Sequence, residues 1–277
     1  MKNQKKSSGL GISFSKAKIV FNFYPWWRRA AKAKKMTKMI VKDSARYSEQ
    51  QRYDFAKKVV GKLMKVFNVN IHVFGIENWL DRGVVLVSNH QSNLDPMALL
   101  AINDYEKQQP IGFIAKKELW EVKTVKNFMN LLDNLPLDRE SPRSALKVMK
   151  DAKELISQYK RAICIFPEGT RSHSQELGEF QPAATKLAQM AFAPIIPVSI
   201  IDSYKIEDKK RPKKLDIKVV FGKPMMPDKF ISMKSEDLAK NVKREIDKGI
   251  KKYENIDLKA ERKKVKKINK KTNCYFY

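Results

Sequence analysis

The chain has 277 residues, of which 43% are hydrophobic, which suffices for one large α/β domain with a helical extension, or for two smaller domains, and excludes disorder over most of its length. Its 57 lysines and arginines exceed its 30 acidic residues by 27, so we expect an anionic partner: nucleic acid, anionic lipid or an acidic protein. The two cysteines, Cys164 in an apolar run and Cys274 in a basic segment, argue against a disulfide framework and a cysteine metal site, and for a reducing compartment.

The N-terminal extension is predicted to be disordered over residues 1–13 and helical over residues 14–68. Trp26 and Trp27 follow a stretch that interleaves aromatic and basic side chains, and they directly precede the basic cluster of residues 28–38. Aromatic rings beside cations suit a bilayer interface, where Trp and Tyr anchor and basic side chains meet anionic head groups. We therefore interpret residues 14–68 as a membrane-associating segment; the alternative is a helix that packs on the domain through its aromatic face.

A second helix is expected from about Ser44 to Phe67, after a linker around residues 35–44. Apolar residues at three- and four-residue steps give it one apolar face: Phe55, Val59, Leu63 and Val66. No apolar run reaches the roughly 18–20 residues of a membrane-spanning helix, and we recognise no signal peptide. The sequence thus predicts a chain that lies on a membrane or stays soluble, and does not cross the bilayer.

Residues 69–255 are predicted to form an α/β domain. The first strand, VNIHVFG, places His72 on its polar phase, where we expect it to face solvent. Further strands are expected at 84–87, 111–115, 135–137, 162–166, 195–201 and 217–221, with helices at 96–105, 142–159, 182–192 and 235–253. Apolar strands that alternate with helices predict a mostly parallel central sheet flanked by helices on both faces. Functional sites of such sheets form in loops beyond the carboxyl ends of the strands.

Residues 256–277 are predicted to form a basic C-terminal tail, because ERKKVKKINKK concentrates positive charge near the end of the sequence. A solvated tail and an anion-binding segment are both open interpretations of this run.

The stretch SNHQSNLDP follows one of the apolar runs and combines His90 with Asp95. Asp95 before Pro96 is typical of a helix start, and the simplest role for Asp95 is an N-cap. A carboxylate there can also reach back to Nδ1 of His90, which would fix the tautomer and leave Nε2 free as a general base. Ser88 and Ser92 are candidate nucleophiles, but nothing marks either as activated, so the base is expected to deprotonate a substrate hydroxyl directly.

A second stretch, IFPEGTRS, again places polar groups after an apolar run. Gly169 would let backbone amides approach a ligand, and Arg171 offers a planar fork that matches phosphate oxygens. Glu168 cannot bind phosphate, so we expect it to hold Arg171 or a substrate hydroxyl. The alternative is an ion pair on the surface of a turn.

Two further loops add positive charge after predicted strands. AKKELW supplies Lys116 and Lys117, and LPLDRESPRSA supplies Arg139 and Arg143. Each pair alone would be an ordinary helix-flanking charge. Together, the four loops predict a base beside an anion-binding site on one rim of the sheet.

At these residues the chain resembles the 1-acylglycerol-3-phosphate O-acyltransferase family of glycerolipid acyltransferases. Four blocks occur in the family's order over roughly residues 70–225: NHQSNLD with its His-x4-Asp pattern, LPLDR ending at Arg139, FPEGTRS at residues 166–172, and PIIPV at residues 194–198. The AKKEL segment at residues 115–119 is also similar to that family. His-x4-Asp alone is a weak pattern, whereas four ordered blocks are specific.

The resemblance implies an enzyme that moves a fatty acyl chain to the sn-2 hydroxyl of lysophosphatidic acid, giving phosphatidic acid in phospholipid biosynthesis. His90, oriented by Asp95, would remove the hydroxyl proton. The acceptor would be bound by Lys116, Arg139, Glu168, Gly169, Thr170 and Arg171. The donor would be acyl-CoA or acyl-acyl carrier protein, with no metal and no bound cofactor. We expect a peripheral enzyme at an anionic membrane, on the cytoplasmic face, and acyl carrier protein as a possible acidic partner.

The chain also departs from the family pattern. Many relatives carry Phe-Lys-x-Gly after the third block, where this chain has FQPAA, with Gln181 and Ala183 in place of the lysine and the glycine. The acceptor could therefore be another lysophospholipid or glycerol-3-phosphate. The competing interpretation from another class is a non-catalytic basic protein that binds membranes or nucleic acid, but no recognition helix, zinc pattern or aromatic strand platform is evident, and we expect no nucleic-acid partner.

Overall fold

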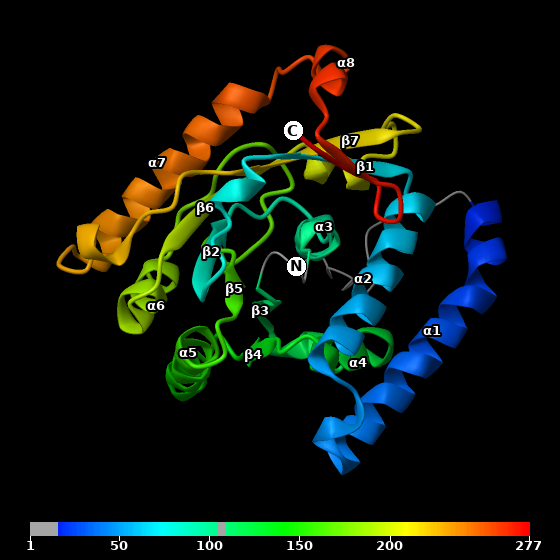
Figure 1. Ribbon diagram of the computed structural model, residues 1–277, viewed down its shortest axis with the longest axis horizontal. Helices are drawn as coiled ribbons and strands as arrows, with labels where there is room; N and C mark the ends of the chain where they lie inside the picture. The colour runs from blue at the N-terminus through cyan, green and yellow to red at the C-terminus, as the bar shows by residue number, and fades with distance from the viewer. Residues whose placement is uncertain (1–15, 105–108) are drawn as a thin grey trace, which may run out of the picture.

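A computed structural model describes residues 16–104 and 109–277, with side chains from residue 26 onward (Figure 1). Residues 1–13, predicted to be disordered, lie outside the described residues. The described strands form one sheet in the order β4-β3-β5-β2-β6-β7-β1-β9-β8. The strands are β1 Val69–Phe74, β2 Val84–Ser88, β3 Ile111–Lys116, β4 Leu135–Leu137, β5 Ala162–Ile165, β6 Ile195–Ile201, β7 Leu215–Phe221, β8 Lys267–Asn269 and β9 Cys274–Phe276. The helices are α1 Lys16–Lys42, α2 Glu49–Val66, α3 Leu94–Ile102, α4 Lys123–Leu131, α5 Pro142–Ser157, α6 Ala183–Ala191, α7 Ser235–Tyr253 and α8 Leu258–Glu261.

The predicted mixed α/β fold is confirmed. The sheet is parallel except at the β6–β7 and β8–β9 pairs, which are antiparallel. Alternate residues of β2 point to opposite faces: Val84 and Leu86 join a core with α1, α2 and α3, whereas Val85 and Val87 join a core with α5, α6 and α7. Helices thus cover both faces, as the continuously apolar strands predict.

The antiparallel step at β6–β7 determines which segments lie at which edge of the sheet. β2, β5 and β6 run parallel, so their carboxyl ends lie at the same end of the sheet. We call this end, where strands begin or stop, the β2 edge; it is not the outer edge formed by a terminal strand such as β8. Because β7 runs the other way and β1 and β9 run parallel to it, these three strands begin at the β2 edge. The β2 edge therefore carries the loops after β2, β5 and β6 and the segments that lead into β7, β1 and β9.

The two N-terminal helices both pack on the α/β domain: α1 lies against α4, and α2 lies against α3, α4 and β1. The buried side chains of Ala33 and Met36 fix α1, and the Trp26 ring stacks on Phe128 of α4 with centroids 6.3 Å apart. Trp27 remains 61% exposed. One tryptophan therefore packs on the domain, as the alternative interpretation expects, and the other faces solvent; membrane association stays a prediction. The break between the helices lies at residues 43–48, later than the predicted linker, because α1 continues to Lys42 and α2 begins with a capping box between Ser48 and Gln51.

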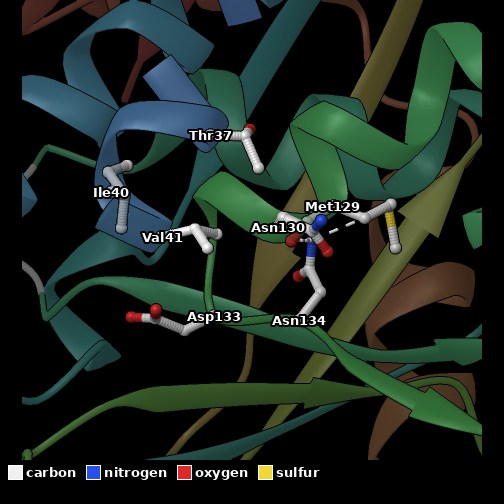
Figure 2. A pocket seen from close by; sticks show the side chains of 7 residues that line it. All are labelled: Thr37, Ile40, Val41, Met129, Asn130, Asp133 and Asn134. Carbon is white, nitrogen blue, oxygen red and sulfur yellow. Dashed lines mark hydrogen bonds between the residues drawn. The ribbon is translucent and has the colours of Figure 1, made fainter. Parts of the chain in front are cut away.

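Near its end, α1 meets α4, an element that the sequence did not predict. The Thr37 hydroxyl donates to the backbone oxygen of Asn127, 3.3 Å away. A hollow of about 280 Å³ between the two helices is lined by Thr37, Ile40, Val41, Met129, Asn130, Asp133 and Asn134 (Figure 2). Within the described residues, no helix combines the length and apolar character required to cross a bilayer.

The C-terminal segment is not a separate tail. The division at residue 255 is wrong for the sheet, because β9 pairs in parallel with β1, with Ile71 opposite Cys274, and β8 pairs with β9 at the outer edge. Cys274 is fully buried. The buried residues of this segment, Thr272 and Cys274, follow the basic run, and the composition of that run obscured them.

His72 is also placed differently from the prediction. It is fully buried rather than solvent-facing. Its Nδ1 lies 2.7 Å from the Tyr277 hydroxyl and its Nε2 lies 2.9 Å from Oδ1 of Asp216. The C-terminal residues cover the face of β1 on which His72 stands, and the local alternation of polar and apolar residues carries no information about a strand 200 positions away.

Candidate active site

The two polar loops come together because their strands are neighbours. β2 leads into SNHQSNLDP and the adjacent parallel strand β5 leads into IFPEGTRS, so both loops emerge at the β2 edge. Their backbones pair directly: Ser172 N donates to His90 O at 2.8 Å and His173 N donates to Gln91 O at 3.3 Å. The structure therefore confirms that the loops after β2 and β5 meet at one end of the sheet, as the sequence predicts.

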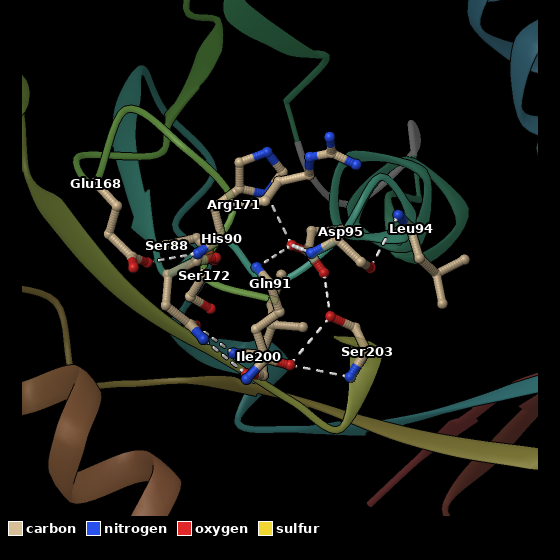
Figure 3. A network of polar contacts seen from close by, with 12 residues as sticks. Ser88, His90, Gln91, Leu94, Asp95, Glu168, Arg171, Ser172, Ile200 and Ser203 are labelled. Atoms are coloured by element: carbon tan, nitrogen blue, oxygen red, sulfur yellow. Dashed lines mark hydrogen bonds and ion pairs between the residues drawn. The ribbon is translucent and has the colours of Figure 1, made fainter. Parts of the chain in front are cut away.

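The His90 ring is held from two directions. Its Nδ1 lies 2.8 Å from Oδ2 of Asp95 (Figure 3). Its face stacks on Phe166 with ring centroids 4.2 Å apart. The Asp95 side chain is fully buried, whereas 19% of the His90 side chain is exposed. Among the described residues, none forms a hydrogen bond with Nε2, so this nitrogen is available to a ligand.

Asp95 is the centre of a network of donors and is not an N-cap. α3 begins at Leu94, and the Asp95 carboxylate turns back from the first turn toward the preceding loop. Oδ2 accepts hydrogen bonds from Gln91 N at 2.6 Å and Ser92 N at 2.8 Å, and Oδ1 accepts one from the Ser203 hydroxyl. Since the backbone amides can only donate, this set of partners matches a carboxylate, and Nδ1 of His90 must carry the proton that it shares with Oδ2.

The segment after β6 completes the site, and sequence reasoning missed it. Ser203 N donates to Oε1 of Gln91 at 3.0 Å, in addition to the contact between the Ser203 hydroxyl and Asp95. Asn89, a member of the recognised motif, exchanges two hydrogen bonds with the backbone of Ile200 in β6, at 2.8 and 2.7 Å. The loop that carries His90 is therefore tied to β6. The one available signal for Ser203 was its position just after a strand of the same edge.

Glu168 supports the backbone of the site and does not hold Arg171, which corrects that prediction. Its Oε1 accepts from His90 N at 2.7 Å and its Oε2 accepts from Gly178 N at 2.8 Å. Burial raises the pKa of the Glu168 carboxyl, although these two backbone hydrogen bonds and the charge of His90 act in the opposite direction. Both oxygens have protein partners, so Glu168 joins the His90 loop to the loop after β5.

Arg171 is paired instead with Glu207, another residue that the sequence did not single out. Its Nη1 lies 3.2 Å from Oε1 of Glu207, and Oε2 of the same carboxylate lies 2.7 Å from Nδ1 of His173. The Arg171 side chain is 34% exposed, so part of the guanidinium faces solvent. In Figure 3 the Arg171 side chain is drawn beside the His90 ring, in line with the backbone contact between Ser172 and His90.

The remaining predicted residues lie along the same edge at β3 and β4. Lys116, at the end of β3, pairs with Glu118 at 3.1 Å and is 55% exposed, and Arg139 follows β4 in an exposed position. Thr170 is also exposed. Gly169 has φ +70°, a left-handed conformation that favours glycine, and no atom within 4 Å would meet a Cβ there, so its surroundings are open. None of the described contacts joins Lys116 or Arg139 to His90.

The nearby hydroxyl and thiol groups are not arranged as nucleophiles. Ser88 is fully buried and its hydroxyl donates to Asn89 O, while Oγ of the buried Ser92 accepts from Leu94 N. Burial, reinforced by the charge of Asp95, raises the pKa of the Cys164 thiol well above its usual value. In the described part of the site, the reactive nitrogen left without a protein partner is thus Nε2 of the partly exposed His90, and direct deprotonation of a substrate is the chemistry that this geometry favours.

Comparison with known proteins gives similarities in sequence and in fold. A family model described as Acyltransferase matches residues 70–201. The protein named probable 1-acyl-sn-glycerol-3-phosphate acyltransferase of Mycoplasma pneumoniae is 35% identical over 217 residues, which cover 75% of this chain and 81% of that protein. The protein of the same name from Mycoplasma genitalium is 39% identical over 170 residues, or 58% of this chain and 63% of the relative.

A solved structure has the same fold. The crystal structure of the 1-acyl-sn-glycerophosphate acyltransferase PlsC from Thermotoga maritima matches with a TM-score of 0.62 and 23% sequence identity. The match covers 87% of this chain and 98% of that one.

Proposed function

This chain belongs to the family of 1-acyl-sn-glycerol-3-phosphate acyltransferases, and from that premise we propose that it transfers a fatty acyl chain from a thioester to the sn-2 hydroxyl of 1-acyl-sn-glycerol-3-phosphate, giving phosphatidic acid. The observation that carries the proposal is the His90–Asp95 pair, in which the carboxylate fixes Nδ1 and leaves Nε2 without a hydrogen-bond partner among the described residues. A partly exposed arginine, Arg171, follows in the neighbouring loop. The names of the relatives support the choice of lysophosphatidic acid as acceptor.

In the proposed reaction, Nε2 of His90 accepts the proton of the sn-2 hydroxyl while the oxygen attacks the thioester carbonyl carbon. The new C–O bond forms a tetrahedral intermediate, and its collapse breaks the C–S bond. The imidazolium then returns the proton to the leaving thiolate, so His90 ends the cycle neutral. Asp95 stabilises the transient imidazolium through the 2.8 Å contact, and its three further donors hold it in position. The acyl donor, acyl-CoA or acyl-acyl carrier protein, is a co-substrate, and no metal or resident cofactor takes part.

The acceptor phosphate is assigned to the cations of the β2 edge. Arg171 uses Nη1 for Glu207, and its remaining N–H groups are the donors left for a phosphate. Lys116 and Arg139 stand further along the same edge, on β3 and after β4, and would approach the phosphate from the other side. Gly169 and Thr170, in the open part of the loop, would present backbone amides.

Both acceptor and product are amphiphiles, so we place the enzyme on the cytoplasmic face of the membrane as a peripheral protein. The exposed Trp27 of α1 and the basic residues that follow it support this location, because such side chains favour the bilayer interface.

The decisive assay combines purified protein, lysophosphatidic acid and a radiolabelled acyl thioester, with wild type and His90→Ala side by side. Wild type is expected to form phosphatidic acid, and His90→Ala to lose at least 100-fold in rate, in line with removal of a general base. Product formation that survives the substitution would remove His90 as the base. Acyl-CoA and acyl-acyl carrier protein are supplied in separate reactions to identify the donor. Glycerol-3-phosphate and other lysophospholipids serve as competing acceptors, because Gln181 and Ala183 depart from the family pattern.

A further inference from the structure

Two lysine-rich segments that are far apart in the sequence meet at the β2 edge beside the end of α2 (Figure 1). Six exposed lysines stand on them, and we call them the rim lysines: Lys209, Lys210, Lys213, Lys214, Lys270 and Lys271. Each segment is held by a hydrogen bond to the backbone at the junction of α2 and β1. Leu215 N donates to Asn68 O at 3.0 Å, and Asn273 Nδ2 donates to Val69 O at 3.1 Å. Within the described part of the chain, none of the rim lysines forms an ion pair, in contrast to the Lys248–Glu245 and Lys251–Asp247 pairs of α7.

These lysines are presented on fixed backbone. The turn between β8 and β9 packs so closely on α2 that a Cβ on Gly61 would lie 2.7 Å from the backbone oxygen of Lys271. Arg211 anchors the other segment, because its Nη2 donates to Phe67 O at 3.0 Å at the end of α2. The contact of Lys271 with Gly61 and the hydrogen bond of Arg211 distinguish these segments from a mobile basic tail. The fold therefore maintains a concentration of like charge at this place.

Repulsion among the neighbouring cations is already visible on α2. The pKa of Lys62 is lowered, chiefly by the charge of Arg29 on α1, then by burial and by Lys58 and Lys65. Like charges that the fold keeps together without acidic partners favour the approach of an anionic partner.

The rim lysines lie on the same edge of the sheet as His90. The first segment follows β6, which ends beside β2, and leads into β7; the second leads into β9, which begins where β1 begins. Figure 1 shows the first half of α1 beside the end of α2, in line with the electrostatic effect of Arg29 on Lys62, and hence on the side of the molecule that carries this edge. Trp27, 61% exposed, belongs to that half of α1.

We propose that the rim lysines form a docking surface for anionic lipid head groups, so that the enzyme lies on the bilayer with the β2 edge and its catalytic loops facing the membrane. Lipid is favoured over an acidic protein because an exposed tryptophan accompanies the cations at the same edge, and this combination suits a bilayer interface. The inference rests on the proposed function and extends it: it adds contacts from the β6–β7 and β8–β9 segments to that of the membrane-associating N-terminal helix, and it fixes the orientation in which a lipid acceptor would reach His90.

The experiment compares three full-length variants with wild type: a quadruple rim variant, a double rim variant and a quadruple control variant. The rim variant carries Lys209→Gln, Lys210→Gln, Lys213→Gln and Lys214→Gln, and a second rim variant carries Lys270→Gln and Lys271→Gln. The control variant carries Lys160→Gln, Lys223→Gln, Lys229→Gln and Lys234→Gln, which are equally exposed, lack ion pairs among the described residues, and stand before β5 or after β7, away from the β2 edge. Binding to vesicles of phosphatidylglycerol and of phosphatidylcholine is measured by sedimentation, and thermal unfolding verifies that each variant is folded.

For phosphatidylglycerol vesicles, we expect the apparent Kd of the quadruple rim variant to rise at least 30-fold and that of the control variant to rise less than threefold. Activity on acceptor embedded in those vesicles should fall in parallel, whereas activity on a monomeric short-chain acceptor should stay unchanged. An equal loss of binding in the control variant would overturn the proposal, because net charge alone would then explain it. Undiminished vesicle binding, with activity lost on acyl-acyl carrier protein but kept on acyl-CoA, would also overturn it and assign the surface to the carrier protein.

The two proposals fail in distinguishable ways. Vesicle binding that depends on the rim lysines, in a wild-type protein that forms no phosphatidic acid, would contradict the proposed reaction and leave the docking surface standing.

Discussion

The Ser203 hydroxyl donates a hydrogen bond to the buried carboxylate of Asp95, although the two residues are 108 positions apart in the chain. Through this contact the segment after β6 fixes the acidic partner of His90 from the side opposite to the imidazole. The His90–Asp95 pair that the sequence predicts is thus held by three segments. The loop after β2 supplies the base, the loop after β5 supplies Glu168, and the segment after β6 supplies Ser203, which donates to the Asp95 carboxylate.

Ser203→Ala should lower kcat by about 10- to 100-fold with little change in either Michaelis constant. A hydrogen bond to a charged group contributes about 1.5–3 kcal/mol, and its loss removes one of the three donors that hold the Asp95 carboxylate in position against Nδ1. Steady-state kinetics on both substrates measure the effect. The matched control is Ser199→Ala on β6, whose hydroxyl donates at 2.8 Å to Ile246 O, outside the site. If both variants lose kcat equally, a general loss of packing around β6 is the cause.

Arg171→Ala should raise the apparent Michaelis constant of the phosphate-bearing acceptor at least tenfold and that of the thioester far less. The reason is that the remaining guanidinium donors are assigned to the phosphate. Arg82→Ala, which removes an exposed arginine before β2 at the other edge, is the control for net charge. Equal increases for both substrates would make Arg171 a structural residue.

Glu207→Gln should also raise the acceptor's Michaelis constant, by about three- to tenfold, because the carboxylate aligns Arg171 from 3.2 Å. The two substitutions act through one another, so the double variant should be no worse than Arg171→Ala alone. Additive effects in this cycle would show that Glu207 acts independently of the guanidinium.

Asp216→Asn should destabilise the fold in a pH-dependent manner. Burial raises the pKa of Asp216, but hydrogen bonds from His72 and Asn70 and the charges of His72 and Arg262 outweigh it and lower the pKa to about 2. A carboxyl whose pKa is lower in the folded than in the unfolded chain stabilises the fold above its unfolded pKa, and that stabilisation disappears as the pH falls through the folded pKa. With the side chain 32% exposed, solvent screening leaves about 1–2 kcal/mol.

Urea unfolding of wild type and Asp216→Asn at pH 7 and at pH values between 4 and 2 measures that difference. The gap in unfolding free energy should be full at pH 7 and close across the acidic range. A gap that is unchanged at pH 2 would mean that packing, and not the charge of Asp216, makes the difference.

The central strands, most helices and the His90–Asp95 pair could be predicted from the sequence because each depends on neighbours in the chain. Apolar runs define buried strands, and a spacing of five residues lets Asp95 reach His90. The partners of Glu168 and Arg171 could not be predicted, since charge alone suggests that these two residues pair with each other. The actual partners are a backbone amide of the β2 loop and Glu207 beyond β6, and only the arrangement of strands brings them close.

The C-terminal strand and the burial of His72 were missed for a related reason. Eleven residues of mostly basic sequence show no apolar run, yet Cys274 and the rings of Tyr275 and Tyr277 cover β1. A short strand that is stabilised by pairing with an existing strand shows little periodic pattern in its sequence, because two or three inward-facing side chains suffice to hold it on the sheet.

The position of β1 between β7 and β9 also bears on how the protein folds. Every pairing that β1 makes joins it to a strand well over a hundred residues later, so closure of that half of the sheet must wait until the intervening chain is ordered. Amide hydrogen exchange should therefore find the β8–β9 hairpin among the segments that open first, while the amides around Asn89 and β6 exchange last. The catalytic loops after β2, β5 and β6 would then keep their structure during fluctuations in which β8 and β9 separate from β1.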